Sequence, residues 1–232
     1  MVNLIAPLLI ALLVAGSAAA QQIVDIPTSQ PPNLGDLKQQ IREYKRSGGY
    51  DRDLAAVAAA AQAYVGQRAG EVTKPALVLD IDETSLSNWP VLEADDFGYI
   101  PNGPCRNLPE GPCGFVAWDY TMRAKAIAPT LALFNAAKAK GVSVFFITGR
   151  RDSERRVTEA NLRAVGYQGW AGLVMRAKDA KGSVADFKSG ERARLEARGY
   201  TIIANMGDQP SDLAGGHFER GFLLPDPFYR IP

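Results

Sequence analysis

The residues best suited to catalysis are two aspartates, Asp80 and Asp82, at the end of the apolar run 76–79. Side chains alternate along a strand that rises about 3.3 Å per residue, so both carboxylates point the same way where the backbone leaves the sheet. At roughly 5 Å and an effective dielectric constant near 20, their repulsion is on the order of 3 kcal/mol, which a cation or a proton must offset. A divalent metal would keep Asp80 ionised as a nucleophile, while Asp82 would exchange its proton as general acid and base.

The elements that position this pair alternate between strands and helices from residue 75 onward. Such alternation is typical of an α/β fold with a parallel sheet and helices on both faces, a Rossmann-like arrangement. Ligands bind such sheets beyond the carboxyl ends of the strands, so polar residues there are the candidates for function. In chain order the pattern predicts strand 76–80, helix 129–140, strand 142–148, helix 153–165, strand 173–176, helix 184–198, strand 201–206 and strand 222–224.

Polar residues follow two further strands. Thr148 and Gly149 end the second strand, Asp208 and Asp212 follow the fourth, and Lys188 lies near the start of the helix before the fourth. Each residue alone has an ordinary explanation, because aspartates favour turns, threonines end strands and most lysines are solvated. Their joint order with the aspartate pair favours one shared site.

Other residue types exclude some classes of enzyme. His217 is the only histidine, which argues against histidine phosphatases and zinc hydrolases, because these need more than one such group. Neither cysteine is followed by arginine at the spacing that a thiol phosphatase needs. Arg150 and Arg151 could orient a substrate, but an ordinary role as surface charge at a helix start carries at least equal weight.

The alternation stops between residues 88 and 124, in a segment rich in proline, glycine and aromatic residues. We interpret this segment as a small cap inserted after the first strand, because a long loop inside a compact domain usually covers a site. We assign its tryptophans and tyrosines to local core rather than to a platform for stacking bases. The aromatic residues are Trp89, Phe97, Tyr99, Phe115, Trp118 and Tyr120.

The chain begins with a segment that has the features of an export signal. The apolar run 4–14 precedes small residues with an Ala-x-Ala cleavage pattern, so residues 1–20 are the expected signal peptide, cleaved near Ala20, and the product is periplasmic or secreted. No lysine or arginine precedes the apolar run, which leaves an uncleaved anchor as the alternative. Pro7 and the short apolar length favour cleavage, with no stable membrane anchor afterwards.

The remaining chain is expected to form one substantial domain, because 47% of the 232 residues are hydrophobic. Residues 21–74 would form an arm and two helices, 36–46 and 53–68, and residues 75–232 the core with its cap at about 88–124. The formal net charge of +1 gives no electrostatic footprint for a nucleic-acid polymer. The sequence carries no signal for an oligomeric state.

Export would place Cys105 and Cys113 in an oxidising compartment. A local disulfide then fits better than two free thiols, and its short ring would contribute about 2.5 kcal/mol in the loop-entropy model. Such a bridge would shape a loop rather than hold the domain together.

The ordered motifs resemble the haloacid dehalogenase superfamily, whose phosphatases carry D-x-D-x-T after the first strand, Ser or Thr after the second, a lysine, and an acidic pair after the fourth. The matching residues are Asp80-Ile81-Asp82-Glu83-Thr84, Thr148, Lys188, and Asp208 with Asp212. The segments 146–150, 187–189 and 207–209, the export signal and the insertion look most like secreted acid phosphatases. These are the bacterial class C enzymes and the plant acid phosphatases related to vegetative storage proteins; the chain departs from lipoprotein members in lacking a lipid-attachment cysteine.

This resemblance implies a role for each candidate residue. Asp80 would attack phosphorus to form an aspartyl-phosphate, and Asp82 would protonate the leaving oxygen and later activate water. Mg²⁺, which prefers hard oxygen ligands, would be held by Asp80, Asp208 and the main-chain oxygen of Asp82, with Asp212 supporting the metal or its waters. Three residues would bind the transferring phosphoryl oxygens: Thr148, Gly149 and Lys188.

The implied function is a secreted, Mg²⁺-dependent acid phosphatase that acts on a small-molecule phosphomonoester. A non-catalytic storage or binding protein on the same scaffold and a phosphotransferase of the superfamily stay open as alternatives. The intact pair of Asp80 and Asp82 argues against the first, since a retired site has no reason to keep two repelling carboxylates. Dehalogenation is disfavoured, because departure of halide needs no acid such as Asp82. Leaving-group specificity and pH optimum are not encoded in the motifs.

Overall fold

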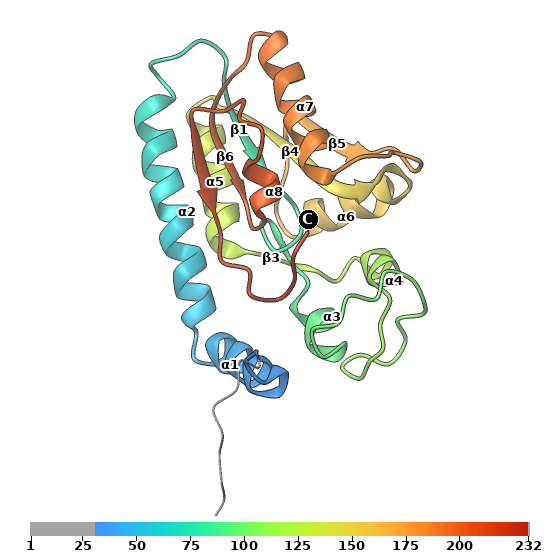
Figure 1. Ribbon diagram of the computed structural model, residues 1–232. Helices are drawn as coiled ribbons and strands as arrows, with labels where there is room; N and C mark the ends of the chain where they lie inside the picture. The colour runs from blue at the N-terminus through green and yellow to red at the C-terminus, as the bar shows by residue number, and fades with distance from the viewer. Residues whose placement is uncertain (1–30, 232) are drawn as a thin grey trace, which may run out of the picture. The chain divides into compact units, whose positions relative to one another are not determined.

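The main sheet has five strands, all paired in parallel, in the order β5-β4-β1-β6-β7 (Figure 1). The computed structural model describes residues 31–231, so the proposed signal peptide lies outside the described residues. The predicted parallel α/β fold is confirmed, and each predicted strand is present within a few residues of its expected ends. The strands are β1 (Pro75–Leu79), β4 (Ser143–Arg151), β5 (Gly172–Arg176), β6 (Thr201–Gly207) and β7 (Arg220–Leu223).

Helices cover both faces of the sheet. Helices α2 (Gly49–Arg68) and α5 (Ala128–Ala139) pack on one face, where Leu162 of α6 (Arg155–Ala164) joins the same apolar cluster. Helix α7 (Val184–Ala197) covers the other face and contributes Leu195 to a second cluster. Figure 1 shows α2 and α7 on opposite sides of the sheet.

Strand β1 shows why its sequence reads as an uninterrupted apolar run. Leu77 and Leu79 belong to the cluster under α2 and α5, while Ala76 and Val78 belong to the cluster under α7. All four side chains are buried because a parallel strand between two helical layers has no solvent-facing side. The apolar run therefore ends where the strand ends, at the aspartate pair.

The two N-terminal helices begin earlier than the apolar spacing predicts. Helix α1 (Leu34–Arg46) starts at Leu34 because the Asn33 side chain accepts a hydrogen bond from the Gly35 main-chain N at 2.8 Å and so caps the helix. Helix α2 starts at Gly49, directly after Gly48, whose φ of 75° permits a tight left-handed turn between the helices.

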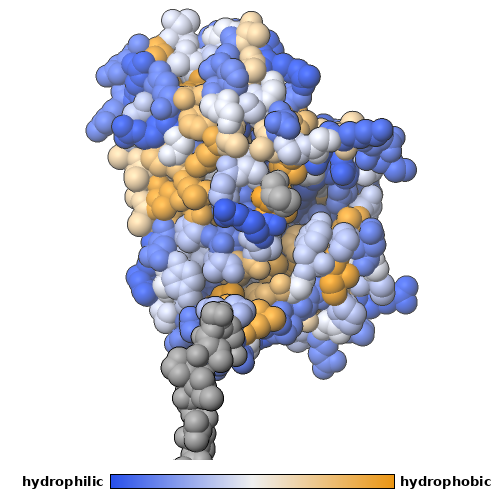
Figure 2. Space-filling model, viewed as in Figure 1, coloured by the Kyte–Doolittle hydropathy of each residue, from blue (hydrophilic) through white to orange (hydrophobic). Residues whose placement is uncertain are grey.

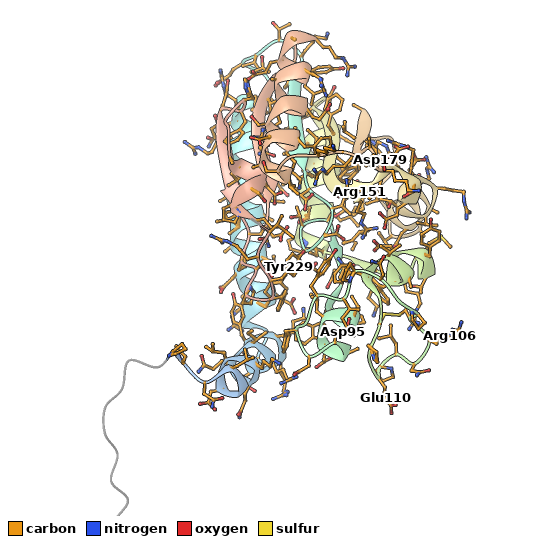
Figure 3. The ribbon with its side chains drawn as sticks, turned by 45° about the vertical axis from the view of Figure 1, so that its right-hand side comes forward. Asp95, Arg106, Glu110, Arg151, Asp179 and Tyr229 are labelled. Atoms are coloured by element: carbon orange, nitrogen blue, oxygen red, sulfur yellow. A yellow bond between two sulfur atoms is a disulfide. The ribbon has the colours of Figure 1, made fainter. Side chains whose placement is uncertain are left out.

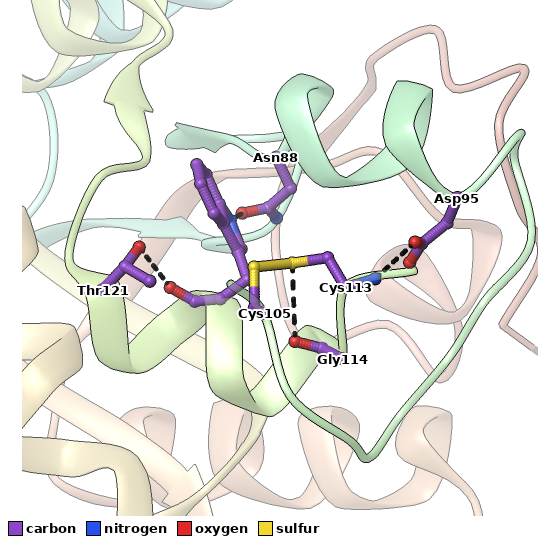
Figure 4. The surroundings of a disulfide bond; sticks show 7 residues. Asn88, Asp95, Cys105, Cys113, Gly114 and Thr121 are labelled. Carbon is purple, nitrogen blue, oxygen red and sulfur yellow. Dashed lines mark hydrogen bonds between the residues drawn. A yellow bond between two sulfur atoms is a disulfide. The ribbon is translucent and has the colours of Figure 1, made fainter. Parts of the chain in front are cut away.

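The cap segment, residues 88–124, is closed at its base by a two-stranded antiparallel sheet. Its strands, β2 (Leu86–Ser87) and β3 (Lys125–Ala126), pair on either side of the insertion. Between them lie two short helices, α3 (Trp89–Ala94) and α4 (Phe115–Thr121), joined by a loop that contains the expected disulfide between Cys105 and Cys113 (Figure 4). These short elements have no clear sequence period, so the sequence predicted only an irregular cap.

Two small elements complete the edge of the sheet that carries the polar residues. The 3-10 turn η1 (Asp152–Glu154) precedes α6, and α8 (Pro210–Leu213) follows β6. No helix within residues 31–231 is both long enough and apolar enough to cross a membrane. On the face shown in Figure 2, apolar patches are interspersed with hydrophilic residues.

Candidate active site

The carboxyl ends of three neighbouring strands bring the candidate residues together. Asp80 follows β1, Thr148 lies near the end of β4, and Asp208 follows β6, with β1 between the other two. A cavity of about 490 Å³ opens at this edge. Six of the predicted residues line it: Asp80, Asp82, Gly149, Lys188, Asp208 and Asp212.

Three carboxylates and one ammonium group form the floor of this cavity. One oxygen each from Asp80, Asp208 and Asp212 lie within 4.8 Å of one another, and all three residues are buried. Lys188 Nζ donates to the Oδ1 atoms of Asp80 and Asp212, at 2.5 Å in both cases. The predicted acidic cluster and its lysine are therefore one contiguous group, which we call the floor cluster.

The floor cluster carries more negative than positive charge. Burial and the neighbouring carboxylates of Asp212 and Asp82 raise the pKa of Asp80 to about 7, although Lys188 acts in the opposite direction. Burial, Asp212 and Asp80 likewise raise the pKa of Asp208 well above its usual range. Burial acts to lower the pKa of Lys188, but the Asp80 and Asp212 carboxylates outweigh it and raise the pKa, so Lys188 keeps its charge. Oxygen donors with excess negative charge fit a hard divalent cation.

Hydrogen bonds fix the two carboxylates that follow β6, Asp208 and Asp212. Thr84 Oγ1 donates to Asp208 Oδ1 at 2.9 Å, and Gln209 Nε2 donates to Asp208 Oδ2 at 2.8 Å. The Gln209 main-chain N donates to Asp212 Oδ2 at 2.9 Å. Glycine is required at Gly207, because a Cβ there would lie 2.2 Å from Asp212 Oδ2. The turn after β6 is thus built to present both carboxylates.

Asp82 has different surroundings from Asp80. The Arg150 guanidinium donates to it through Nε, 3.0 Å from Oδ2, and through a terminal nitrogen, 2.6 Å from Oδ1. Asn88 Nδ2 also donates to Asp82 Oδ1, at 2.8 Å. Burial acts to raise the pKa of Asp82, but the charge and hydrogen bonds of Arg150, with the Asn88 amide, lower it below its usual value. The two aspartates of one strand end are therefore electrostatically distinct.

Arg150 is a site residue that the sequence did not rank above surface charge. Of the two roles left open, surface charge does not fit, since Arg150 is 7% exposed and also approaches Asp119 Oδ1 of the cap segment, 2.9 Å from a terminal nitrogen. The register of β4 and β5 is irregular here: Thr148 pairs with Met175 and Arg151 with Arg176. Three residues along β4 correspond to one residue along β5, so Gly149 and Arg150 form a bulge. A bulge changes the direction in which its side chains point, which accounts for the orientation of Arg150. A Gly-Arg pair at the strand end was its only signal.

Asn88 links the acid/base candidate to the cap segment. Its side-chain oxygen accepts a hydrogen bond from Trp118 Nε1 at 2.9 Å (Figure 4). Its main-chain N donates to Glu83 Oε1 at 2.6 Å, and Glu83 has a left-handed φ of 48°. Trp118 is buried, as expected for local core. Neither Asn88 nor Glu83 belongs to a recognisable spacing pattern, which is why sequence reasoning missed both.

Thr148 lies beneath the cavity surface rather than on it. Its side chain is fully buried, and its Oγ1 accepts a hydrogen bond from the Arg150 main-chain N at 3.1 Å. The cavity wall at this strand end is formed instead by Gly149, whose missing side chain leaves the main chain accessible. His217, by contrast, lies away from the cavity, where Nδ1 is 2.6 Å from Glu196 Oε2.

The cap segment forms the opposite wall of the cavity. Tyr99, Phe115 and Asp119 line it from this side, and Tyr229 lines it from the C-terminal tail. Figure 3 shows Tyr229 and Arg151 between the sheet and the insertion, while Arg106 lies in the outer loop. The inserted segment therefore lines the same cavity as the predicted residues.

This fold and site define a phosphatase of the haloacid dehalogenase type. Residues 13–232 match the family model of HAD superfamily, subfamily IIIB (acid phosphatase), and the chain belongs to that family. It is accordingly a phosphomonoesterase by family, as its motifs implied.

Solved structures show the same fold. The class C acid phosphatase from Bacillus anthracis aligns with a TM-score of 0.67 over 84% of this chain and 86% of that chain, at 21% sequence identity. A structure of the Bacillus anthracis enzyme with tungstate bound aligns with a TM-score of 0.65. At this level of identity the likeness shows the architecture.

Plant proteins are among the relatives. Acid phosphatase 1 from Solanum lycopersicum is 31% identical over 194 residues, covering 82% of this chain and 73% of the relative. Stem 28 kDa glycoprotein from Glycine max is 33% identical over 175 residues, covering 73% of this chain and 66% of the relative. Vegetative storage protein 1 from Arabidopsis thaliana is 30% identical and covers 67% of this chain and 55% of the relative.

Proposed function

We propose that this chain is an exported, Mg²⁺-dependent acid phosphatase that hydrolyses small-molecule phosphomonoesters through an aspartyl-phosphate on Asp80. One observation carries the proposal: the two aspartates of one strand end have opposite surroundings. Asp80 lies in a carboxylate cluster with a lysine, as a nucleophile beside a metal site would, while Asp82 is held by a guanidinium at the cavity wall. Pairs of carboxyl groups with divergent environments mark divided roles in catalysis.

The metal would be held by Asp80, Asp208 and the main-chain oxygen of Asp82, with Asp212 supporting it. When bound, Mg²⁺ would keep Asp80 ionised and offset the charge of the phosphoryl oxygens. The raised pKa values of Asp80 and Asp208 support this assignment, because burial and the neighbouring carboxylates disfavour their charged forms and a bound cation would offset both effects.

The phosphoryl group would be bound by Lys188 and by the main chain at Gly149, which both line the cavity. The Thr148 hydroxyl, predicted as a third ligand, lies below the cavity surface and would support this strand end through its hydrogen bond from the Arg150 main-chain N. Lys188 already contacts Asp80, so an oxygen bound by its ammonium group lies next to the nucleophile. Phosphoryl transfer depends mainly on positioning and charge stabilisation, which these groups supply without covalent chemistry of their own.

The reaction then has two displacement steps. An Asp80 carboxylate oxygen attacks phosphorus, the bond to the leaving oxygen breaks, and Asp82 gives that oxygen its proton. Water next attacks the aspartyl-phosphate, gives a proton to Asp82 and releases inorganic phosphate with Asp80 restored. Arg150 and Asn88 fix the orientation of Asp82 for both transfers.

Release of phosphate from aryl phosphates and nucleoside monophosphates, with Mg²⁺ present, tests this proposal. We expect Asp80→Asn to lower kcat by at least about 10³-fold, as expected for loss of a nucleophile that acts in a unit. Asp51→Asn is the matched control, because it makes the same chemical change at an exposed carboxylate paired with Lys45 on the helical arm. Substantial residual activity in Asp80→Asn would overturn the assignment of the nucleophile.

The same assay separates the alternatives. The relative named as a vegetative storage protein makes a non-catalytic protein a real alternative, and absence of turnover on every substrate would favour it. Acceptor alcohols added to the assay distinguish a phosphotransferase, which would release more alcohol than phosphate. Hydrolysis releases both in equal amounts.

We further propose export, with cleavage near Ala20 and residues 21–74 preceding a core that begins at residue 75. The Cys105–Cys113 disulfide supports export, since structural disulfides persist in oxidising compartments. The intact mass of the protein, expressed with its leader in a secreting host, gives the position of the cleavage site. We expect the mature N-terminus to lie near Gln21.

A further inference from the structure

Two arginines lie side by side on the wall of the cavity, away from the floor cluster. The bulge at Gly149 and Arg150 brings Arg151 of β4 into register with Arg176 of β5. Register partners on neighbouring strands project from the same face of a sheet. Both side chains line the cavity.

No carboxylate within residues 31–231 forms an ion pair with this arginine pair. The ion pairs of the described residues include Arg150 with Asp82 and Asp119, but neither Arg151 nor Arg176 takes part in one. Among residues 31–231 the guanidinium groups donate to neutral carbonyls, Arg151 to Ala177 O at 3.1 Å and Arg176 to Gly182 O at 2.9 Å. The Arg176 guanidinium also lies 5.8 Å from the centroid of the Phe187 ring, an uncharged contact. Like charges on adjacent positions of neighbouring strands destabilise a sheet.

Arg176 is the more informative member of the pair. It is 7% exposed, and its Nε is buried without a hydrogen-bond partner among residues 31–231. Burial and the adjacent Arg151 charge lower its pKa. A buried donor without a partner costs free energy, and a buried unpaired charge costs more, so both call for an anionic partner.

The acidic side chain that contacts the bulge is already engaged. Glu154 accepts a hydrogen bond from the Arg151 main-chain N at 2.9 Å, and its charge acts on Asp119 and Arg150. The pair therefore lines the cavity without an ion-pair partner among residues 31–231. The cavity volume of about 490 Å³ is that of a site for a small organic molecule, so it has room for a leaving group beyond the phosphoryl position.

We propose that Arg151 and Arg176 form a second anion subsite, which binds a carboxylate or phosphate carried by the leaving group. The preferred substrates are then phosphomonoesters that bear a second anionic group on the alcohol. This inference rests on the proposed function, because it needs the scissile phosphoryl group to occupy the floor cluster. The arginine pair would then select among leaving groups, whereas the floor cluster would contact only the phosphoryl group.

A series of matched substrates tests the subsite. Phosphate esters of linear ω-hydroxycarboxylates with three to six carbons are compared with their uncharged ω-carboxamides, which have nearly the same length and leaving-group oxygen. We expect the wild-type protein to show a higher kcat/KM for the acid at one or more lengths, by about tenfold, as for one charge-assisted contact. Bisphosphates of the corresponding diols show whether phosphate serves as well as carboxylate.

Variants locate the source of this preference. Arg151→Gln and Arg176→Gln should each reduce the acid-to-amide ratio towards one, mainly through KM, and leave kcat for the amide unchanged within about threefold. Arg176→Lys keeps the charge and should retain part of the ratio, which distinguishes binding from a fold defect. Arg194→Gln is the control, because it removes an exposed arginine that pairs with Glu191 outside the cavity.

Binding of phosphonates gives a readout that does not require turnover. Calorimetry compares ω-carboxyalkylphosphonates with their carboxamides on wild type and on both glutamine variants. Tighter binding of the acid by wild type alone supports the subsite. An acid-to-amide ratio of one at every length, or a ratio that persists in both glutamine variants, overturns it. Turnover of the amides with no preference for the acids would refute the subsite alone, whereas absence of any turnover would refute the proposed function.

Discussion

The floor of the cavity and the arginine pair on its wall treat charge in opposite ways. On the floor, Lys188 forms ion pairs with Asp80 and Asp212. On the adjoining wall Arg150 pairs with Asp82, so charges of opposite sign lie next to each other in both places. At the arginine pair, two like charges share one face, and within residues 31–231 they contact carbonyls and the Phe187 ring but take part in no ion pair. The catalytic groups are held in place by ion pairs within the protein. The two arginines that would bind the leaving group have no such partner and would be neutralised only by an anionic group of the substrate.

This difference predicts how each region responds to substitution. Removing one partner of a buried ion pair leaves an uncompensated charge, at a cost of about 3–5 kcal/mol. Removing one of two repelling arginines relieves repulsion instead. Floor variants should therefore lose activity and often stability, while variants of the arginine pair should lose selectivity alone.

Metal removal gives the largest effect expected among the tests of this contrast. We expect a chelator to lower kcat by more than about 100-fold, because the floor cluster then keeps its excess negative charge. Added Mg²⁺ should restore activity and raise the free energy of unfolding, by about 2.7 kcal/mol at a concentration of 100 times Kd. Thermal unfolding with and without Mg²⁺ measures this independently of turnover.

Asp208→Asn provides the matching variant. It removes one of three crowded carboxylates, so the metal-free protein should be at least as stable as wild type, while the stabilisation by Mg²⁺ should be lost. An unfolding temperature that rises with Mg²⁺ equally in both proteins would show that the metal binds elsewhere.

Substitution of Arg150 has the next largest expected effect. Arg150→Gln should lower kcat by roughly 10- to 100-fold, as for loss of a residue that orients a catalytic group. Arg150 helps to hold the pKa of Asp82 low against burial, so its removal raises that pKa. Because Asp82 must be protonated to act as the acid, activity falls as pH rises through its pKa, and the alkaline limb should move to higher pH.

The pH profile of kcat for wild type, Arg150→Gln and Arg194→Gln measures this shift. The Arg194 variant changes an exposed arginine and should superimpose on wild type. A lower kcat with an unmoved alkaline limb would mean that Arg150 only supports the local fold.

The contrast also separates what the sequence could predict from what it could not. Asp80 and Asp208 were predictable because each directly follows an apolar strand, and parallel strands deliver their ends to one edge. Lys188 and Asp212, which lie on helices, were predictable only from the order of the motifs. Arg150 and the register of Arg151 with Arg176 depend on a bulge of two residues, which leaves no periodic trace in the sequence. The bond from Trp118 to Asn88 joins residues 30 positions apart and depends on how the short cap helices pack. Residue spacing could not predict contacts that depend on the long-range packing of irregular segments.

Ionic strength should have the smallest of the predicted effects, a change in the preference for acids over amides. The screening length falls from about 30 Å at 0.01 M to about 3 Å at 1 M ionic strength, but buried pairs are screened much less than exposed ones. Arg151 is the more exposed member of the arginine pair. Raising NaCl across this range should therefore lower the acid-to-amide ratio of kcat/KM by roughly two- to threefold in wild type, with little change for the amide. In Arg151→Gln, where buried Arg176 alone would remain, the residual ratio should be nearly independent of salt; equal salt sensitivity in both proteins would contradict the division between an exposed and a buried arginine.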